Sequence, residues 1–134
     1  MAKKILIVDD VLNVRFMLKI LLSCIQGGFK IDESVSFDNA LDLLEENNYD
    51  LIILDYDLRD KATGWNIAKK IKCCRYKYGN PKVMLMSESM RPEDADLTLA
   101  EYDCYVGKPF NILTFSREIE RLLDCRVVYR NYLN

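Results

Sequence analysis

Short runs of consecutive apolar residues alternate with amphipathic stretches along this chain. Three clear apolar runs span residues 5–8, 51–54 and 83–86, and two weaker ones span 31–35 and 105–106. A short apolar run that ends at polar or turn residues is typical of a strand buried on both of its faces. We therefore predict five strands, with a helical segment after each of them.

The segments between these runs place apolar residues at helical spacing. The first helix is expected over residues 14–25, and it should end at Gly27-Gly28 because glycine favours helix termination. A second helix follows over 37–44, and a third lies between residue 65 and the turn at 79–81. The apolar face of the first helix is predicted to consist of Val14, Met17, Leu18, Leu21, Leu22 and Ile25.

Two more helices complete the pattern. Pro92 starts the fourth, since proline suits the first helical turn, and Asn111 can cap the fifth. The fifth helix is expected to bury Ile112, Phe115, Ile119, Leu122 and Leu123. Buried strands that alternate with amphipathic helices predict an α/β fold, with a parallel sheet covered by helices on both faces.

Composition restricts the chemistry that this fold can carry. The 134 residues include no histidine, which excludes a Ser-His-Asp triad, a Cys-His pair, a HExxH zinc site and a phosphohistidine in this chain. A net charge of -2 gives no reason to expect direct nucleic-acid binding or an anionic membrane surface as partner. The five cysteines form no CxxC motif and no apolar stretch is long enough to span a membrane, so we expect a reduced, cytoplasmic protein.

Polar residues follow four of the five predicted strands. They are Asp9 and Asp10, Asp55, Ser87 and Lys108. Each alone is more often a turn or cap residue, but open α/β sheets bind ligands at the carboxyl ends of their strands, where these residues would meet. Lys108 offsets one of the three carboxylate charges, and the remainder matches one divalent cation. Oxygen ligands without histidine favour Mg²⁺, and Mg²⁺ beside a carboxylate, a lysine and a hydroxyl points to phosphoryl transfer.

The segments around these residues resemble those of response regulator receiver domains. They read ILIVDD at 5–10, LIILD at 51–55, MLMS at 84–87 and YVGKPF at 105–110. The resemblance extends from residue 3 to about residue 125. It implies a flavodoxin-like, doubly wound fold of five strand–helix units with strand order 2-1-3-4-5.

The same resemblance suggests how the chain divides. We expect the receiver domain at residues 1–126 and a C-terminal tail, or the start of a linker, at 127–134. It would act as a monomer or a weak homodimer. Its partners would be a histidine kinase or a histidine phosphotransfer protein and a downstream protein target.

The resemblance also implies a role for each residue of the acidic site. Asp55 would accept a phosphoryl group from a phosphohistidine on the partner. Asp10 and Asp55 would bind Mg²⁺ directly, together with the backbone carbonyl of Asp57, and Asp9 would hold the metal through water. Lys108 would contact the phosphoryl oxygens.

Two further residues are implied to relay the signal. Ser87 would donate its hydroxyl to the phosphoryl group, and Tyr105 would change rotamer as Ser87 moves. These changes would alter the surface formed by the fourth helix, the fifth strand and the last helix. The Lys108-Pro109 peptide bond would be cis, and it would orient the lysine.

The sequence departs from the receiver pattern close to the acceptor. Arg59 stands where proline is common, and Gly64 comes one residue later than usual, so we expect a longer loop after the acceptor. Glu88 replaces a small residue beside the switch hydroxyl and is expected to slow phosphorylation or alter the phosphoryl lifetime. Asp57 and Ser89 occupy the positions that tune dephosphorylation in the family.

Two other functions fit part of the pattern. Residues 51–58 resemble the nucleophile motif of haloacid-dehalogenase-type phosphatases, with Asp55 as nucleophile and Asp57 as acid. That motif normally lies near the start of a chain, and its second acidic pair comes after the lysine. A pseudo-receiver that binds partners without phosphorylation is the other alternative. The leading hypothesis is a phosphorylation-dependent switch that assists its own modification and is not a turnover enzyme.

Overall fold

A computed structural model of the chain describes residues 2–25, 28–58, 64–88 and 102–124. Its five strands form one sheet in the order β2-β1-β3-β4-β5, and all four neighbouring pairs run parallel. The strands are β1 (Lys3–Val8), β2 (Phe29–Ser34), β3 (Leu51–Asp55), β4 (Lys82–Ser87) and β5 (Cys104–Gly107). The predicted fold class and strand order are therefore confirmed.

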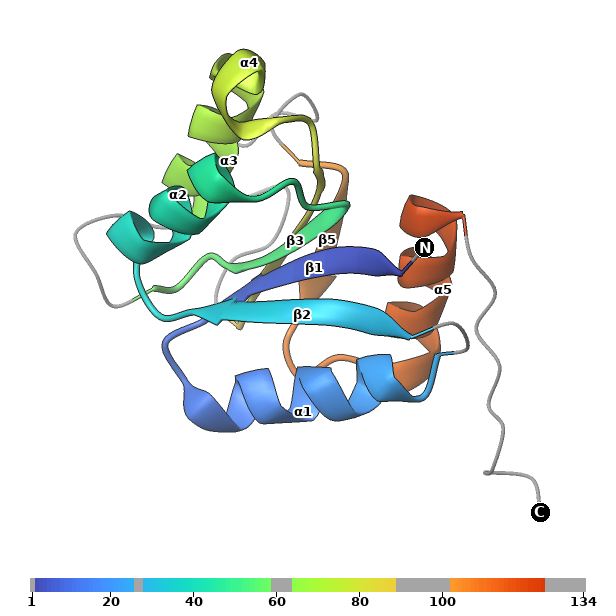
Figure 1. Cartoon of the computed structure of the whole chain (residues 1–134). Helices are drawn as coiled ribbons and strands as arrows, with labels where there is room; N and C mark the ends of the chain where they lie inside the picture. The colour runs from blue at the N-terminus through green and yellow to red at the C-terminus, as the bar shows by residue number, and fades with distance from the viewer. Residues whose placement is uncertain (1, 26–27, 59–63, 89–101, 125–134) are drawn as a thin grey trace.

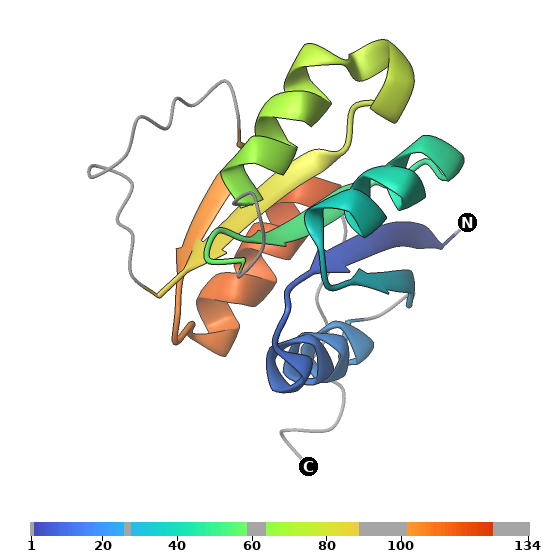
Figure 2. The same ribbon diagram turned by 90° about the vertical axis from the view of Figure 1, so that its left-hand side faces the viewer.

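Helices cover both faces of this sheet (Figures 1 and 2). They are α1 (Leu12–Ser23), α2 (Phe37–Glu46), α3 (Gly64–Cys73), α4 (Arg75–Tyr78) and α5 (Ile112–Leu123). One face carries α1 and α5, and the other carries α2 and α3 with the short α4. Among the described residues, no helix is long and apolar enough to cross a membrane.

The continuous apolar runs follow from this double cover. Successive side chains of a strand point to opposite faces, so a strand between two helical layers needs apolar residues at every position. In β1, Ile5 and Ile7 belong to the core beneath α1 and α5. Leu6 and Val8 belong to the core beneath α2 and α3. β2 lies at the sheet edge and is less buried, and Val35, predicted in this strand, is 51% exposed beyond its end.

Two helix boundaries differ from the prediction. The first helix ends at Ser23, before the predicted glycine pair, because the amide of Cys24 already closes the last turn on the carbonyls of Leu21 and Leu22. The predicted third helix is interrupted at Cys74, where the backbone leaves helical geometry (φ −123°, ψ 51°). The chain continues as α4, whose last residue, Tyr78, is buried in the core.

Two predicted core positions are also wrong. Met17 of α1 is 44% exposed and Ile112 of α5 is 38% exposed, while their helices bury other apolar residues of the same faces. Asn111 caps α5 as predicted, and its Oδ1 accepts hydrogen bonds from the amides of Leu113 and Thr114. The helix predicted to begin at Pro92 lies outside the described residues, so the label α4 belongs to a different helix.

Two cysteines in contrasting environments give a test of this fold. Burial, helped by the neighbouring Glu118 carboxylate, raises the pKa of the Cys104 thiol to about 12, whereas Cys73 is exposed. Since the thiolate is the reactive form, we expect a maleimide to modify Cys73 at least about 100-fold faster than Cys104 in the folded protein. Peptide mapping by mass spectrometry checks this, with the denatured chain as control. Similar rates at both thiols in the folded protein would contradict the packing of β5.

Candidate functional site

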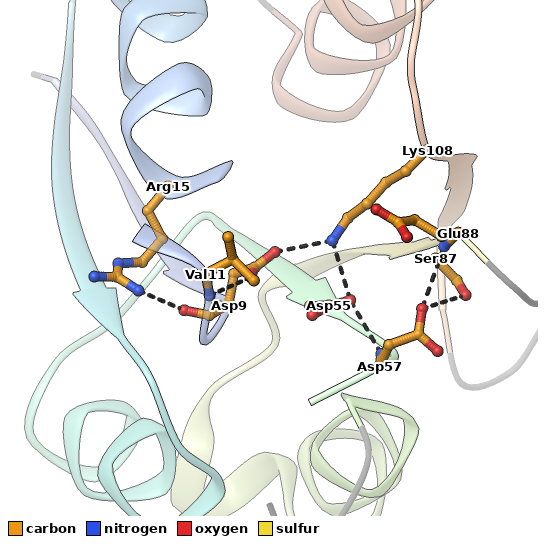
Figure 3. A network of polar contacts seen from close by, with 8 residues as sticks. All are labelled: Asp9, Val11, Arg15, Asp55, Asp57, Ser87, Glu88 and Lys108. Atoms are coloured by element: carbon orange, nitrogen blue, oxygen red, sulfur yellow. Dashed lines mark hydrogen bonds and ion pairs between the residues drawn. The ribbon is translucent and has the colours of Figure 1, made fainter. Parts of the chain in front are cut away.

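The carboxyl ends of β1, β3, β4 and β5 bring the predicted polar residues to one edge of the sheet (Figure 3). Asp9 directly follows β1, Asp55 and Ser87 are the last residues of β3 and β4, and Lys108 directly follows β5. The parallel register aligns these ends, with Asp55 opposite Met86. Strand geometry alone therefore collects the site from segments far apart in the sequence.

Three carboxylates gather at this edge. Asp9, Asp10 and Asp55 each offer an oxygen, and these oxygens lie within 4.8 Å of one another. Asp9 and Asp55 are buried, at 2% and 4% exposure, and Asp10 is partly exposed. Oxygens that ligate Mg²⁺ lie about 2.0–2.1 Å from the ion, and so roughly 3–4 Å from each other. The donor set and its spacing fit a small divalent cation.

Lys108 reaches into this cluster from the end of β5. Its Nζ donates to Oδ2 of Asp9 at 3.0 Å and to Oδ1 of Asp55 at 3.2 Å. The Lys108 amide also donates to the Ser87 carbonyl at 2.8 Å, which fixes the lysine backbone against β4. The peptide bond to Pro109 is cis, as predicted. The lysine side chain is 10% exposed, so its interaction with the two carboxylates is largely shielded from water.

Burial and charge shift the pKa of two groups in the site. Burial raises the pKa of the Asp55 carboxyl, and the nearby Asp9 charge raises it further. The Lys108 ammonium and the Asp57 amide act in the opposite direction without cancelling this effect. Burial disfavours the charged form of Lys108, but its bonds to Asp9 and Asp55 outweigh burial and raise its pKa. An added cation would relieve the repulsion between the carboxylates.

Asp9 has two further contacts that orient it. Its Oδ1 accepts a hydrogen bond from the Val11 amide at 2.8 Å, and its backbone carbonyl accepts one from Nη1 of Arg15 at 2.8 Å. Arg15 also forms an ion pair with Glu33 at 3.0 Å. Nothing in the sequence pattern of α1 distinguishes Arg15 from the other polar residues on that helix, so its contact with Asp9 was not predicted.

Asp57 contacts the site through its side chain as well as its backbone (Figure 3). Its amide donates to Oδ1 of Asp55 at 3.0 Å. Its Oδ2 accepts two hydrogen bonds, from Ser87 Oγ at 2.8 Å and from the Glu88 amide at 3.2 Å. The receiver resemblance implied a metal-binding role for the backbone carbonyl of Asp57 and a tuning role for the residue, but it did not indicate this contact between the carboxylate and the buried Ser87.

The remaining predicted residues lie around this centre or outside the described residues. Tyr105 of β5 is partly buried and packs against the core beneath α2 and α3. Glu88 is exposed at the end of β4. Ser89 and Arg59 fall outside the described residues. Gly64 begins α3 directly over the Asp55 backbone, where an added Cβ would lie 2.3 Å from the Asp55 carbonyl oxygen.

Known proteins share this sequence pattern. Residues 5–120 match the family model of the response regulator receiver domain. The chemotaxis protein CheY of Pseudomonas aeruginosa is 27% identical over 121 residues, a match that covers 90% of this chain and 96% of that protein. The transcriptional regulatory protein ResD of Bacillus subtilis is 30% identical over 98% of this chain. The match covers 52% of ResD, so the chain spans about half the length of that regulator.

Solved structures share the fold. The response regulator protein TrrA of Thermotoga maritima, in complex with Mg(2+)-BeF, matches with a TM-score of 0.75 and 33% identity over 90% of this chain and 99% of that chain. The signal receiver domain of a DNA binding response regulator from Colwellia psychrerythraea 34H matches with a TM-score of 0.80 and 24% identity, over 91% of this chain and 98% of that one. Since the family model covers most of the sequence, the chain belongs to the response regulator receiver domain family.

Proposed function

We propose that Asp55 accepts a phosphoryl group from a phosphohistidine of a histidine kinase or phosphotransfer protein, so that the chain works as a phosphorylation-dependent switch. Receiver domains are signalling domains of two-component systems that bind Mg²⁺ at an acidic pocket and interact with such partners. The observation that carries the proposal is the position of Asp55. Its buried carboxylate belongs to an acidic cluster suited to a cation and accepts a hydrogen bond from the ammonium of Lys108.

The arrangement suits attack by a carboxylate on phosphorus. The Asp57 amide and Lys108 Nζ both donate to Oδ1 of Asp55, so we assign the other oxygen, Oδ2, as the nucleophile. It would form a bond to phosphorus while the bond from phosphorus to the partner's imidazole nitrogen breaks. Asp10, Asp55 and the Asp57 carbonyl would hold Mg²⁺ directly and Asp9 through water, and the bound ion supplies positive charge that offsets the phosphoryl oxygens.

We further propose how phosphorylation of Asp55 alters the surface of the protein. The Ser87 hydroxyl would turn to a phosphoryl oxygen, and the end of β4 would follow it. β5 pairs with β4 throughout, with Tyr105 opposite Leu85, so a shift of β4 reaches the tyrosine through one strand pair. A changed Tyr105 rotamer would alter the surface of β5 and α5 that a downstream protein binds.

Phosphoryl incorporation tests the proposed function. With Mg²⁺ and a small phosphodonor or a phosphorylated kinase, intact mass should show one added phosphoryl group in the parent protein. Asp55→Asn should show none, because the nucleophilic oxygen is lost. Asp42→Asn on the exposed surface of α2 is the matched control and should be modified like the parent. Chelation of the metal should reduce incorporation to the level of Asp55→Asn.

Three outcomes would contradict this proposal in different ways. An adduct that persists in Asp55→Asn would place the acceptor elsewhere. No adduct from any donor, although Mg²⁺ binds, would favour a pseudo-receiver that binds partners without phosphorylation. Release of free phosphate from phosphate esters would favour the phosphatase alternative, with Asp55 as nucleophile and Asp57 as acid.

A further inference from the structure

Two hydrogen-bond donors at the end of β4 converge on one oxygen. Ser87 Oγ and the Glu88 amide lie 2.8 Å and 3.2 Å from Oδ2 of Asp57 (Figure 3). The amide of Asp57 is bonded in turn to Oδ1 of Asp55 at 3.0 Å. The carboxylate that accepts hydrogen bonds from both donors therefore belongs to the loop that follows Asp55.

An adjacent hydroxyl and amide form a favourable site for an anionic oxygen. A phosphoryl group on Asp55 would bring a charge of about −1.5 to −2 and three acceptor oxygens to the same edge of the sheet. The Ser87 hydroxyl has one proton, so it can donate to Asp57 or to a phosphoryl oxygen, but not fully to both. The two anions would compete for the same donor.

We propose that the Asp57 carboxylate is an internal competitor of the phosphoryl group, which holds Ser87 and the Glu88 amide in the arrangement of the unmodified protein. This inference rests on the proposed function of Asp55. A phosphoryl group on Asp55 would repel the Asp57 carboxylate and take over its donors. Asp57 is partly exposed, so its carboxylate has access to water when it is displaced.

The consequence is a bias toward the unmodified state. Any group that binds one of two conformations better shifts the population toward it, and here that group is part of the chain. Asp57 is thus a positioning residue that acts through Ser87. Its removal should make a phosphoryl analogue bind more tightly, because the analogue no longer has to displace a bound carboxylate.

Calorimetric titration with beryllium fluoride in saturating Mg²⁺ tests this competition. Asp57→Ala, which leaves the backbone carbonyl in place, should bind the analogue about tenfold more tightly than the parent. Asp57→Asn, which can still accept a hydrogen bond but lacks the charge, should lie between them. Asp42→Asn removes an exposed carboxylate on α2 and leaves Asp57 and its two donors unchanged, so it should change the affinity less than about threefold.

The hydroxyl separates this competition from a general effect of charge. If Asp57 acts through Ser87, the gain from Asp57→Ala should fall below about threefold in a Ser87→Ala background. An undiminished gain in that background would overturn the competition for the hydroxyl. Unchanged or weaker binding by Asp57→Ala, with normal binding by the parent, would overturn this inference and leave the role of Asp55 intact. No binding by any variant, although each binds Mg²⁺, would overturn both.

Discussion

Gly64→Ala is expected to lower the free energy of unfolding by about 2–4 kcal/mol. The added Cβ would lie 2.3 Å from the carbonyl oxygen and 2.8 Å from the carbonyl carbon of Asp55, well inside van der Waals contact. Both atoms are backbone, so no change of rotamer relieves the clash, and either β3 or the start of α3 must move. Because the displaced residue carries the proposed acceptor, we also expect affinity for Mg²⁺ to fall at least about tenfold.

Chemical denaturation and a Mg²⁺ titration check both parts of this prediction. Gly107→Ala is the matched control, since it lies at the same edge of the sheet and an added Cβ there meets no atom within 4 Å. We expect it to change the free energy of unfolding by less than about 0.5 kcal/mol. Equal stability of the two variants would show that α3 does not approach the Asp55 backbone as closely as the structure indicates.

The sequence was sufficient for the fold and for much of the site because both depend on strands. Four consecutive apolar residues in β1 supply both cores, and that requirement is visible as an unbroken apolar run. The carboxyl ends of parallel strands share one edge of the sheet. The sequence therefore predicted that Asp9, Asp55, Ser87 and Lys108 lie together, without knowledge of any interatomic distance. The receiver resemblance then supplied the strand order.

What the sequence could not predict depends on how each helix packs against the sheet and on side-chain rotamers. Helical spacing identified apolar faces that include Met17 and Ile112, but the faces are wider than the contact that each helix makes with the sheet, so both residues remain exposed. The bond between Asp57 and Ser87 joins residues 30 positions apart. It depends on one side-chain direction, which a strand-end argument cannot supply, and it is the contact on which the competition for Ser87 rests.

Lys108→Met is expected to lower the free energy of unfolding by about 3–5 kcal/mol in the absence of divalent cations. The substitution keeps the apolar length of the side chain but leaves Asp9 and Asp55, each with 3% side-chain exposure, without the ammonium that bridges them. Mg²⁺ should restore part of the loss, because a cation bound to the folded state alone stabilises it by about 2.7 kcal/mol at 100 times its dissociation constant.

The pH dependence of this loss follows from the direction of two pKa shifts. Burial and the Asp9 charge raise the pKa of Asp55 in the folded protein, and removal of Lys108 takes away an influence that lowers it. A carboxyl with a raised folded pKa destabilises the fold above that pKa, and the effect disappears below its unfolded value near 3.8. The difference between parent and variant should therefore shrink as the pH falls from 7 toward 4.

The alkaline side gives an independent check on the same ion pair. The pKa of Lys108 is raised above 10.5 because its bonds to Asp9 and Asp55 outweigh the effect of burial. Its contribution to stability is therefore fully present below pH 10.5 and is lost as the pH rises through the folded pKa. The parent should lose this contribution in strongly alkaline solution, and the variant, which has no ammonium at this position, should not.

Lys72→Met provides the comparison that decides the origin of the effect. Lys72 is also largely buried, at 13% side-chain exposure, and pairs with Asp103 at 3.3 Å, outside the acidic cluster. The Asp103 carboxylate is more exposed and also accepts a hydrogen bond from the Val83 amide. Lys72→Met should therefore lower the free energy of unfolding by only about 1 kcal/mol, and Mg²⁺ should not restore this loss. If the two variants lost equal stability and responded equally to Mg²⁺, Lys108 would be an ordinary ion-pair partner, and it would not balance the charge of carboxylates that bind a cation.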